Sequence, residues 1–437
     1  MDPARIEAFA VAPPGFRDLV ARELRDLGFS GVEEEEGGAR FRCGWEGVLR
    51  ANLWCRVASR VLVRVGRFTA TDWRALKRGL VRVPWGEWLP RGCGVEVRAA
   101  KRASPLYHTG RIARIGYEAL EEALGAVRGP GAFRVQIRVV GADVTVSLDT
   151  SGEHLHRRGY RSRIGPAPLR ENLAAGLVLR AGWRGTEPFL DPMCGSGALA
   201  IEAAWIALGV PPGGRRRFAF EGFVRHDPDL WQTLRSGAVA RARRELPAPV
   251  FASDRDPMAL ARTAAAARAA GLAELLQVAR ADVAEVAPPA EGGLVLTNPP
   301  YGRRLAGRGG ALAALGSALR GSLARWRWAV VVAGPGDEHR LGLRPVDRHP
   351  FRHGGLSLYL AVGEAEGLRS APAQGGEQER GREQGEGRGR RMETPGTSSR
   401  ARERPRPGRE RGVPEPGPPG AVRRGGGHAV PPFPVGP

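Results

Sequence analysis

The segment of this chain that most directly suggests chemistry is Thr297-Asn298-Pro299-Pro300-Tyr301. It follows an apolar run, 294–296, that predicts a buried strand. The Asn298 side-chain oxygen and the Pro299 carbonyl could hold the two hydrogens of an amino group conjugated to a base. Consecutive prolines stiffen the turn and remove backbone donors, and Tyr301 could stack on the base. We therefore predict methylation of an exocyclic amine, with Asn298, Pro299, Pro300 and Tyr301 as catalytic residues that act mostly by positioning.

A glycine turn, 191–197, lies upstream and follows a second expected strand at 188–190. Glycines allow a tight turn and the close approach of a ligand. The third glycine of a dinucleotide fingerprint is missing, and no Lys-Ser or Lys-Thr pair marks a phosphate-binding loop. Carboxylates after the strands make S-adenosylmethionine the better ligand: Asp254 for the ribose, Asp282 for the adenine edge and Asp191 near the methionine amino group. The residues expected to bind this cofactor are Asp191, Met193, Cys194, Gly195, Ser196, Gly197, Asp254, Asp282 and Asn298.

Some of these residue types also have purely structural interpretations. A carboxylate after a strand can end a turn or cap a helix, and we favour that role for Asp256, which precedes Pro257. Cys194 has no histidine-based activation in the sequence, so we interpret it as a small loop residue. The histidines show no metal-ligand spacing, and no metal is expected.

Composition points to a nucleic-acid partner. The 437 residues hold 67 Lys and Arg against 46 Asp and Glu, a formal charge of +21 that suits a polyanion. Nearly all the basic residues are arginines, as in GC-rich genomes, so part of the excess could be unrelated to function. The four cysteines form no pairwise motif, which favours a reducing compartment without disulfides or zinc. Neither a long apolar run nor a secretory signal is evident, so we expect a cytoplasmic protein with no membrane contact.

The fold class expected is α/β. Up to about residue 160 short strands alternate with helices, which suggests small α+β layers. From about residue 188 strands and helices alternate as in a parallel, doubly wound sheet, which a strand at 356–362 would close. An insertion, 210–249, is longer than a crossover needs. After about residue 363 large apolar residues nearly vanish, so the tail should be disordered.

These motifs resemble the bacterial ribosomal RNA guanine-N2 methyltransferases of the RlmL type. The resemblance is carried by the segments 191–197, 201–204 and 298–305, and by 53–60, 148–152, 155–161, 168–175 and 226–232. It implies a Rossmann-like class I methyltransferase preceded by an α+β ferredoxin-like and THUMP region. The implied domains are 1–65 (ferredoxin-like), 66–152 (THUMP, RNA-binding), 153–363 (S-adenosylmethionine-dependent methyltransferase) and 364–437 (disordered tail).

The resemblance also implies a reaction, namely methylation of N2 of one guanosine in 23S rRNA, either free or in a large-subunit precursor. Arg157, Arg158, Arg161 and Arg163 of the connector are candidates for phosphate contacts. Ala198 replaces a threonine usual in the family, which could weaken one cofactor contact. Because some relatives carry a second methyltransferase whereas this chain continues into the tail, one reaction is expected. The alternatives are methylation of tRNA guanine, methylation of DNA adenine at N6, and a non-catalytic RNA-binding assembly factor. The sequence leaves the oligomeric state open.

Overall fold

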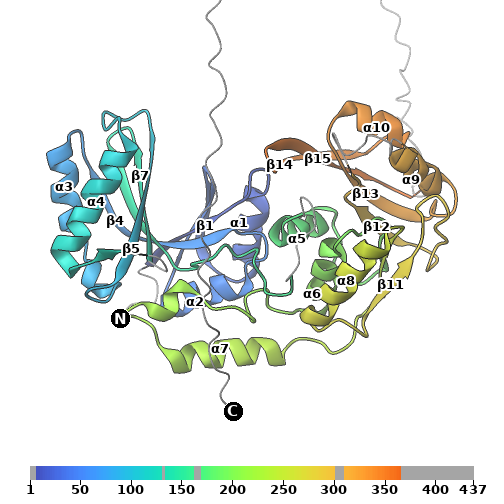
Figure 1. The fold of residues 1–437 in the computed structure, drawn as a ribbon, viewed down its shortest axis with the longest axis horizontal. Coiled ribbons are helices and arrows are strands. Elements are labelled where there is room, and N and C mark those ends of the chain that lie inside the picture. The colour runs from blue at the N-terminus through green and yellow to red at the C-terminus, as the bar shows by residue number, and fades with distance from the viewer. Residues whose placement is uncertain (1–5, 130–132, 162–168, 301–309, 366–437) are drawn as a thin grey trace, which may run out of the picture. The chain divides into compact units, whose positions relative to one another are not determined.

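The computed structural model of the protein describes residues 6–129, 133–161, 169–300 and 310–365, which form two large sheets with their helices (Figure 1). Tyr301 and Arg163 lie outside the described residues. So does the tail that the sequence predicted to be disordered, apart from its first two residues, Glu364 and Ala365. No helix in the described ranges is long and apolar enough to span a membrane.

The first sheet has the strand order β2-β3-β1-β4-β8-β7-β5-β6. Its strands are β1 (Ile6–Val11), β2 (Ser30–Glu35), β3 (Gly38–Cys43), β4 (Arg60–Thr69), β5 (Gly94–Arg102), β6 (Val127–Arg128), β7 (Phe133–Val140) and β8 (Asp143–Asp149). The helices that accompany it are α1 (Arg17–Asp26), α2 (Trp45–Trp54), α3 (Trp73–Val81), the short η1 (Trp85–Glu87) and α4 (Thr109–Leu124).

Strand β4 joins the two halves of this sheet. It pairs with β1 on one side and with β8 on the other, both antiparallel. The boundary expected between a ferredoxin-like and a THUMP region, after residue 65, therefore lies inside β4. The sequence suggested separate small layers, whereas the backbone forms one continuous eight-stranded sheet.

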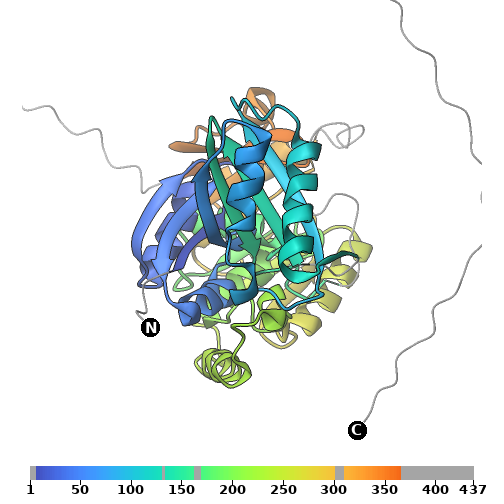
Figure 2. The same cartoon turned by 90° about the vertical axis from the view of Figure 1, so that its left-hand side faces the viewer.

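Helices α3 and α4 cover one face of the sheet at β4, β5 and β7 (Figures 1 and 2). Strand β7 shows why. Val135, Ile137 and Val139 are buried on the helix side, and alternation then places Arg134 and Arg138 on the other face. These two arginines pair there with Glu96 and Glu36, which makes that face strongly polar.

The second sheet has the order β11-β10-β9-β12-β13-β15-β14. Its strands are β9 (Phe189–Asp191), β10 (Val250–Asp254), β11 (Leu276–Arg280), β12 (Gly293–Thr297), β13 (Trp326–Val332), β14 (Asp347–His353) and β15 (Leu356–Gly363). Its helices are α5 (Glu171–Arg180), α6 (Ala198–Leu208), α8 (Pro257–Ala270), α9 (Gly310–Arg320) and α10 (Pro335–Leu341), while η2 (Ala219–Gly222) and α7 (Pro228–Ala240) form the insertion.

The central strands of this sheet are buried on both faces. Phe189, Leu294 and Leu296 belong to a core shared with α6 and α8, whereas Leu190 and Val295 belong to a second core with α9 and α10. Strands covered on both sides need continuous apolar sequence, which is why β9 and β12 show no alternation.

The parallel sheet expected from the sequence is only partly right. Strands β9 to β13 are parallel, but β15 runs antiparallel to β13, and β14 pairs antiparallel with β15. Segment 356–362 therefore does not form the edge, because β14, which the sequence did not reveal, lies outside it. Strand β14 is polar, with only Phe351 buried, so it lacks the apolar signal of the inner strands.

Candidate functional site

The glycine turn lies between β9 and α6, and its two glycines do different things. Both have left-handed backbones, with φ of 58° at Gly195 and 77° at Gly197. A Cβ on Gly197 would lie 2.7 Å from Cγ2 of Thr263 on α8, whereas a Cβ on Gly195 would meet nothing within 4 Å. Gly197 thus allows close packing of the loop on α8, and Gly195 leaves the backbone open to a ligand.

Asp254 ends β10 and fixes the glycine turn from the neighbouring strand. Its Oδ2 accepts a hydrogen bond of 2.9 Å from the Gly195 N–H, and its Oδ1 accepts one of 2.9 Å from the Asp256 N–H. Asp256 in turn accepts from Met258 N–H at the start of α8, which confirms its interpretation as a helix cap. Asp254 is therefore held against the turn with carboxylate lone pairs still available.

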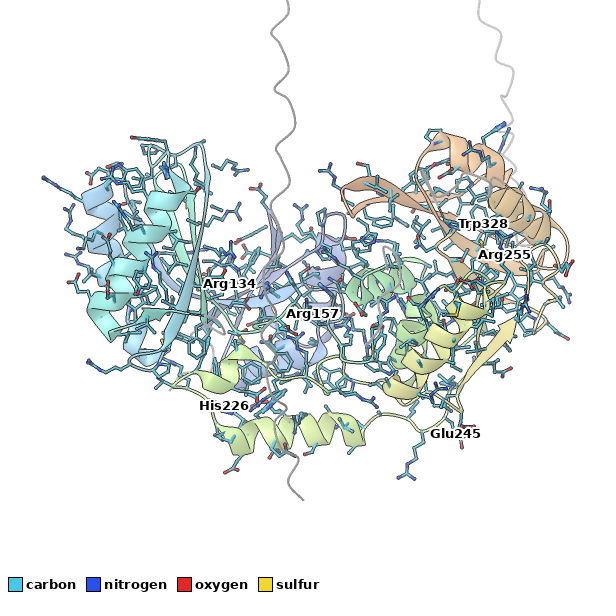
Figure 3. The ribbon with its side chains drawn as sticks, viewed as in Figure 1. Arg134, Arg157, His226, Glu245, Arg255 and Trp328 are labelled. Atoms are coloured by element: carbon cyan, nitrogen blue, oxygen red, sulfur yellow. The ribbon has the colours of Figure 1, made fainter. Side chains whose placement is uncertain are left out.

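Asp282 follows β11, and its side chain is 38% exposed. It accepts a hydrogen bond from Ala284 N–H, and its Oδ2 lies 3.7 Å from Nη1 of Arg255, which Figure 3 labels. Because β10 and β11 are parallel neighbours, Asp254 and Asp282 lie at the same edge of the sheet. The structure thus brings together the two carboxylates that the sequence assigned to ribose and adenine.

Asp191 is the most buried carboxylate of this edge, at 1% exposure. Its Oδ1 accepts 2.8 Å from the Thr297 hydroxyl and 3.3 Å from Met193 N–H. Burial raises the pKa of Asp191 to about 7, despite these hydrogen bonds, and the charge of Asp254 adds to the rise. Within the described ranges neither aspartate pairs with a basic side chain. This edge therefore favours a bound cation.

The Asn-Pro-Pro turn lies beside Asp191, because β12 pairs with β9 and Thr297 bonds to Asp191. The Asn298 Oδ1 is buried and has no hydrogen-bond partner among the described residues. Pro299 is buried and Pro300 partly so. A buried acceptor without a partner is costly unless a ligand supplies a donor.

The remaining loop residues have supporting positions. Cys194 is buried, its Sγ lies 3.6 Å from the Thr263 hydroxyl, and burial raises its thiol pKa far above the ordinary value. That excludes a thiolate nucleophile and agrees with its interpretation as a loop residue. Met193 packs against the second core, and Ser196 accepts a hydrogen bond from Arg161. Ala198 is buried at the start of α6.

These observations fit S-adenosylmethionine. The sulfonium and ammonium are cations, and they suit an edge where Asp191 and Asp254 lack basic partners. Gly195 leaves room for a ligand against the backbone. The carboxylates of Asp254 and Asp282, which the sequence predicted as acceptors for ribose and adenine, lie at the same edge of the sheet. In the part of the chain that the structure describes, no cluster of His, Cys, Asp and Glu could hold a metal ion.

Two of the connector arginines that were expected to contact RNA phosphates are buried. Arg158 is only 1% exposed, and it donates to Glu202 on α6 and to the carbonyls of Leu155 and Arg56. The Arg161 side chain is 7% exposed. Neither can contact RNA phosphates, so that expectation is wrong for both. A buried charge needs fixed partners, and these partners are distant in sequence. Arg157 remains exposed and pairs with Glu153.

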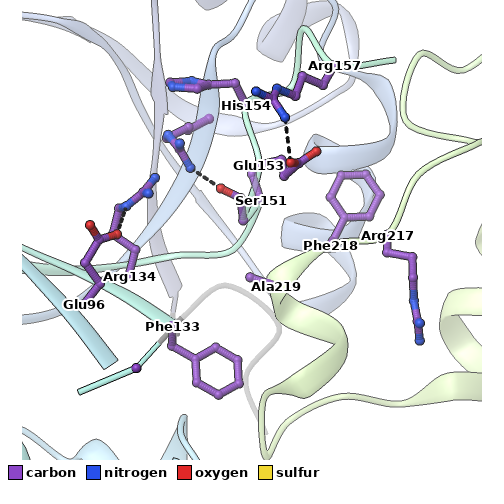
Figure 4. A pocket seen from close by; sticks show the side chains of 13 residues that line it. Glu96, Phe133, Arg134, Ser151, Glu153, His154, Arg157, Arg217, Phe218 and Ala219 are labelled. Carbon is purple, nitrogen blue, oxygen red and sulfur yellow. Dashed lines mark hydrogen bonds and ion pairs between the residues drawn. The ribbon is translucent and has the colours of Figure 1, made fainter. Parts of the chain in front are cut away.

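A cavity of about 750 Å³ lies between the polar face of the first sheet, the connector and the insertion (Figure 4). Its lining includes Arg60, Glu96, Phe133, Arg134, Glu153, His154, Arg157, Arg217 and Phe218. Burial, reinforced by the charges of Arg60, Arg170 and Arg134, lowers the pKa of His154 to about 4. The imidazole is therefore neutral at pH 7, mainly because desolvation disfavours its charged form, and the neighbouring arginines add to the effect.

Sequence reasoning missed the contacts that three residues make at the site. Thr263 holds the glycine turn through Gly195 O, Thr297 holds Asp191, and Arg161 reaches Ser196. One signal was available for Thr263, since it is the polar member of an otherwise alanine-rich inner face of α8. Arg161 gave none, because its partners are 8 to 35 residues away.

The order 3-2-1-4-5 of the parallel strands, ending in an antiparallel hairpin, and the glycine turn after the first strand define a class I methyltransferase. Residues 158–335 match the family described as RMKL-like methyltransferase domain, and residues 7–62 match the RlmL ferredoxin-like domain. The chain thus contains a methyltransferase domain of the RMKL-like family and a ferredoxin-like domain of the RlmL family.

Known proteins agree with this. The ribosomal RNA large subunit methyltransferase K/L of Chromohalobacter salexigens is 35% identical over 382 residues, which cover 81% of this chain and 52% of that protein. The chain thus spans about half the length of the curated relatives it matches. A putative methyltransferase crystallised with S-adenosylhomocysteine superposes with a TM-score of 0.76 at 28% identity, covering 84% of this chain and 99% of that one.

A Listeria monocytogenes protein whose structure is described as a predicted N6-adenine-specific DNA methylase gives a TM-score of 0.75 at 29% identity, over 82% of this chain and 96% of that one. The comparisons confirm the Rossmann-like methyltransferase fold with its ferredoxin-like domain, and they confirm S-adenosylmethionine as the cofactor expected from the sequence.

Proposed function

We propose that the protein transfers a methyl group from S-adenosylmethionine to the exocyclic N2 of a guanosine in 23S rRNA. The relatives named large subunit methyltransferase K/L support the rRNA substrate. The observation that carries the chemistry is the Asn298 Oδ1, buried and without a partner among the described residues, one residue after the threonine that binds Asp191. This supports a role for Asn298 as an acceptor for an amino group beside the strand that ends in Asp191.

In this proposal the reaction is a direct displacement. The bound cofactor supplies an electrophilic methyl group: N2 forms a bond to the methyl carbon as the carbon–sulfur bond breaks, and one N2 proton passes to water. Asn298 Oδ1 and the Pro299 carbonyl accept the two N2 hydrogens and turn the lone pair toward the methyl carbon. Tyr301, which lies outside the described residues, keeps its proposed role as a stacking partner. The base leaves its stack to reach this turn.

The polar face of the first sheet supports RNA binding. Within it, residues 66–152 are proposed as a THUMP domain behind a ferredoxin-like region at 1–65, with the methyltransferase domain at 153–363. The cavity of Figure 4 joins this face to the connector and carries Arg134, Arg157 and Arg217. Arginines around a recessed surface suit phosphates and unstacked bases. The RNA, free or in a large-subunit precursor, would be met in the cytoplasm without a metal ion.

Adenine N6 of DNA is the second candidate, because an Asn-Pro-Pro-Tyr turn also suits that amine and the Listeria protein carries that description. Guanine N2 of tRNA is the third. Both share the transfer chemistry. The DNA candidate differs from the rRNA proposal in the target base and in the nucleic acid, whereas the tRNA candidate differs only in the nucleic acid that the first sheet must hold.

The test is methyl transfer from labelled S-adenosylmethionine to protein-free 23S rRNA, a large-subunit precursor, bulk tRNA and DNA, with the product nucleoside identified by mass spectrometry. We expect N2-methylguanosine in 23S rRNA. Asn298→Ala should lower the rate by about 100- to 1,000-fold, the range for loss of one positioned hydrogen bond in a transition state. Gln277→Ala, which removes an exposed amide from β11 of the same sheet, is the control and should leave the rate unchanged. Label only in tRNA or in DNA would replace the rRNA assignment.

A further inference from the structure

Arg161 is a buried cation that reaches the glycine turn from the connector. Its Nη2 donates to Ser196 Oγ, its Nη1 donates 2.7 Å to the Leu169 carbonyl, and the same Nη1 lies 3.4 Å from Glu171 Oε1. Its side chain is 7% exposed, and its Nε has no hydrogen-bond partner among the described residues. An arginine this buried normally uses its whole donor fork, so the buried Nε–H, which lacks an acceptor among the described residues, calls for one.

Negative and positive side chains approach the glycine turn from different sides. Asp191 and Asp254 end β9 and β10 without basic partners in the described ranges, and Arg161 approaches the same turn at Ser196. An anionic edge and a buried cation on one short loop are complementary to a ligand that carries separated positive and negative groups. The methionine moiety of the cofactor is such a group, with a sulfonium and an ammonium at one side and a carboxylate at its end.

We propose that Arg161 binds the carboxylate of the methionine moiety, with Ser196 as the hydroxyl that positions the guanidinium. This assignment rests on the proposed function, since it requires S-adenosylmethionine on the glycine turn. Arginine suits the role because its planar fork meets a carboxylate through two parallel hydrogen bonds. Glu171, whose side chain is 9% exposed, holds the guanidinium from the start of α5 and keeps its charge compensated before the ligand arrives.

The alternative is that Arg161 only clips the connector to the turn. The two roles differ in what they require of the ligand. If Arg161 binds the carboxylate, its loss weakens only those ligands that carry a carboxylate. If Arg161 only holds the connector against the turn, its loss weakens every ligand of the turn equally. Decarboxylated S-adenosylmethionine, which keeps the sulfonium and the amine but lacks the carboxylate, separates the two.

The experiment measures the dissociation constants of S-adenosylmethionine and of its decarboxylated form by titration calorimetry, for the full chain and its Arg161→Met and Arg161→Lys variants. Wild type should bind the decarboxylated form about 10- to 100-fold more weakly, as expected for loss of a charge-assisted pair. Arg161→Met should weaken S-adenosylmethionine by a similar factor and leave the decarboxylated form unchanged. Arg161→Lys should recover part of the loss. Arg157→Met, from the exposed end of the same connector, should change neither constant.

Equal weakening of both ligands by Arg161→Met would overturn the proposal and leave a structural clip. If that variant does not fold, wild type and Arg161→Lys still decide: wild type that binds both ligands equally well overturns the assignment. Wild type that binds neither ligand would remove the proposed function itself. Tight binding without methyl transfer to RNA would leave the Arg161 assignment standing while the proposed reaction fails.

Discussion

The two glycines of the cofactor turn give a matched pair of substitutions with different expected effects. Alanine at either position must adopt a left-handed backbone, which costs roughly 1–2 kcal/mol. At Gly197 the new Cβ would also lie 2.7 Å from Thr263 Cγ2, and relieving such overpacking in a buried contact costs about 1–3 kcal/mol more. Gly197→Ala should therefore lower the free energy of unfolding by about 2–5 kcal/mol, and Gly195→Ala by about 1–2 kcal/mol.

Cofactor affinity should respond in the opposite order. The Cβ of Gly195→Ala points into open space where the ligand is expected, so this better-folded variant should lose S-adenosylmethionine affinity about tenfold or more. Chemical denaturation followed by tryptophan fluorescence gives the first quantity, and calorimetric titration gives the second.

A second substitution tests the cause. Thr263→Ser removes the Cγ2 that Gly197→Ala would meet but keeps the hydroxyl, which donates 3.2 Å to the Gly195 carbonyl. The double variant Gly197→Ala/Thr263→Ser should have a free energy of unfolding about 1–2 kcal/mol higher than the sum of the two single effects predicts. Equal destabilisation by the two glycine substitutions, or an additive cycle, would refute the reasoning from the contact with Thr263.

Three further outcomes are expected. Arg158→Met should lower the free energy of unfolding by about 3–5 kcal/mol in chemical denaturation, because it leaves the carboxylate of Glu202 buried without its cation. The surface variant Arg157→Met should lower the same free energy by at most about 1 kcal/mol. Burial raises the pKa of Asp191 from 3.8 to about 7, so the folded, cofactor-free protein holds a proton that the unfolded chain releases, and stability must fall as pH rises through that window. Asp191→Asn should remove this dependence, a difference of about 2–3 kcal/mol between pH 5 and pH 8. Arg217→Ala should weaken RNA binding and reduce the slope of log K against log salt by about 0.7–0.9 in filter binding, as expected for one lost phosphate contact.

Each of these has its own control. Glu23 also has a pKa raised to about 7 by burial, so the pH comparison is made as the difference between Asp191→Asn and wild type, in which Glu23 cancels. An Asp191→Asn curve parallel to wild type would contradict the assignment. Arg22 on α1 is an exposed arginine that does not line the cavity, so Arg22→Ala is the control for Arg217→Ala. If both substitutions change the salt slope equally, net charge explains the effect and the phosphate contact of Arg217 is contradicted.

Local patterns in the sequence predicted the helices and strands that carry the site. The local sequence marks the ends of helices α6 and α8: glycines flank α6, a capping aspartate and a proline begin α8, and a glycine follows it. The alternation of apolar and polar residues along β7 and β8 is likewise typical of a hairpin, and the two strands pair antiparallel. The polar strand β14 and the insertion helix α7 were not foreseen, since α7 buries only Trp231 and Ala238 and so shows little periodicity.

The sequence by itself determined the chemistry available: an Asn-Pro-Pro-Tyr turn, a glycine turn and strand-end carboxylates in the order that a methyltransferase needs. Only the tertiary structure decided which charges are free to act. Arg158 and Arg161 look like solvated connector residues in the sequence, but folding buries them against Glu202 and Ser196. Burial and ion pairing depend on residues brought together from distant parts of the chain, and no local pattern encodes that encounter.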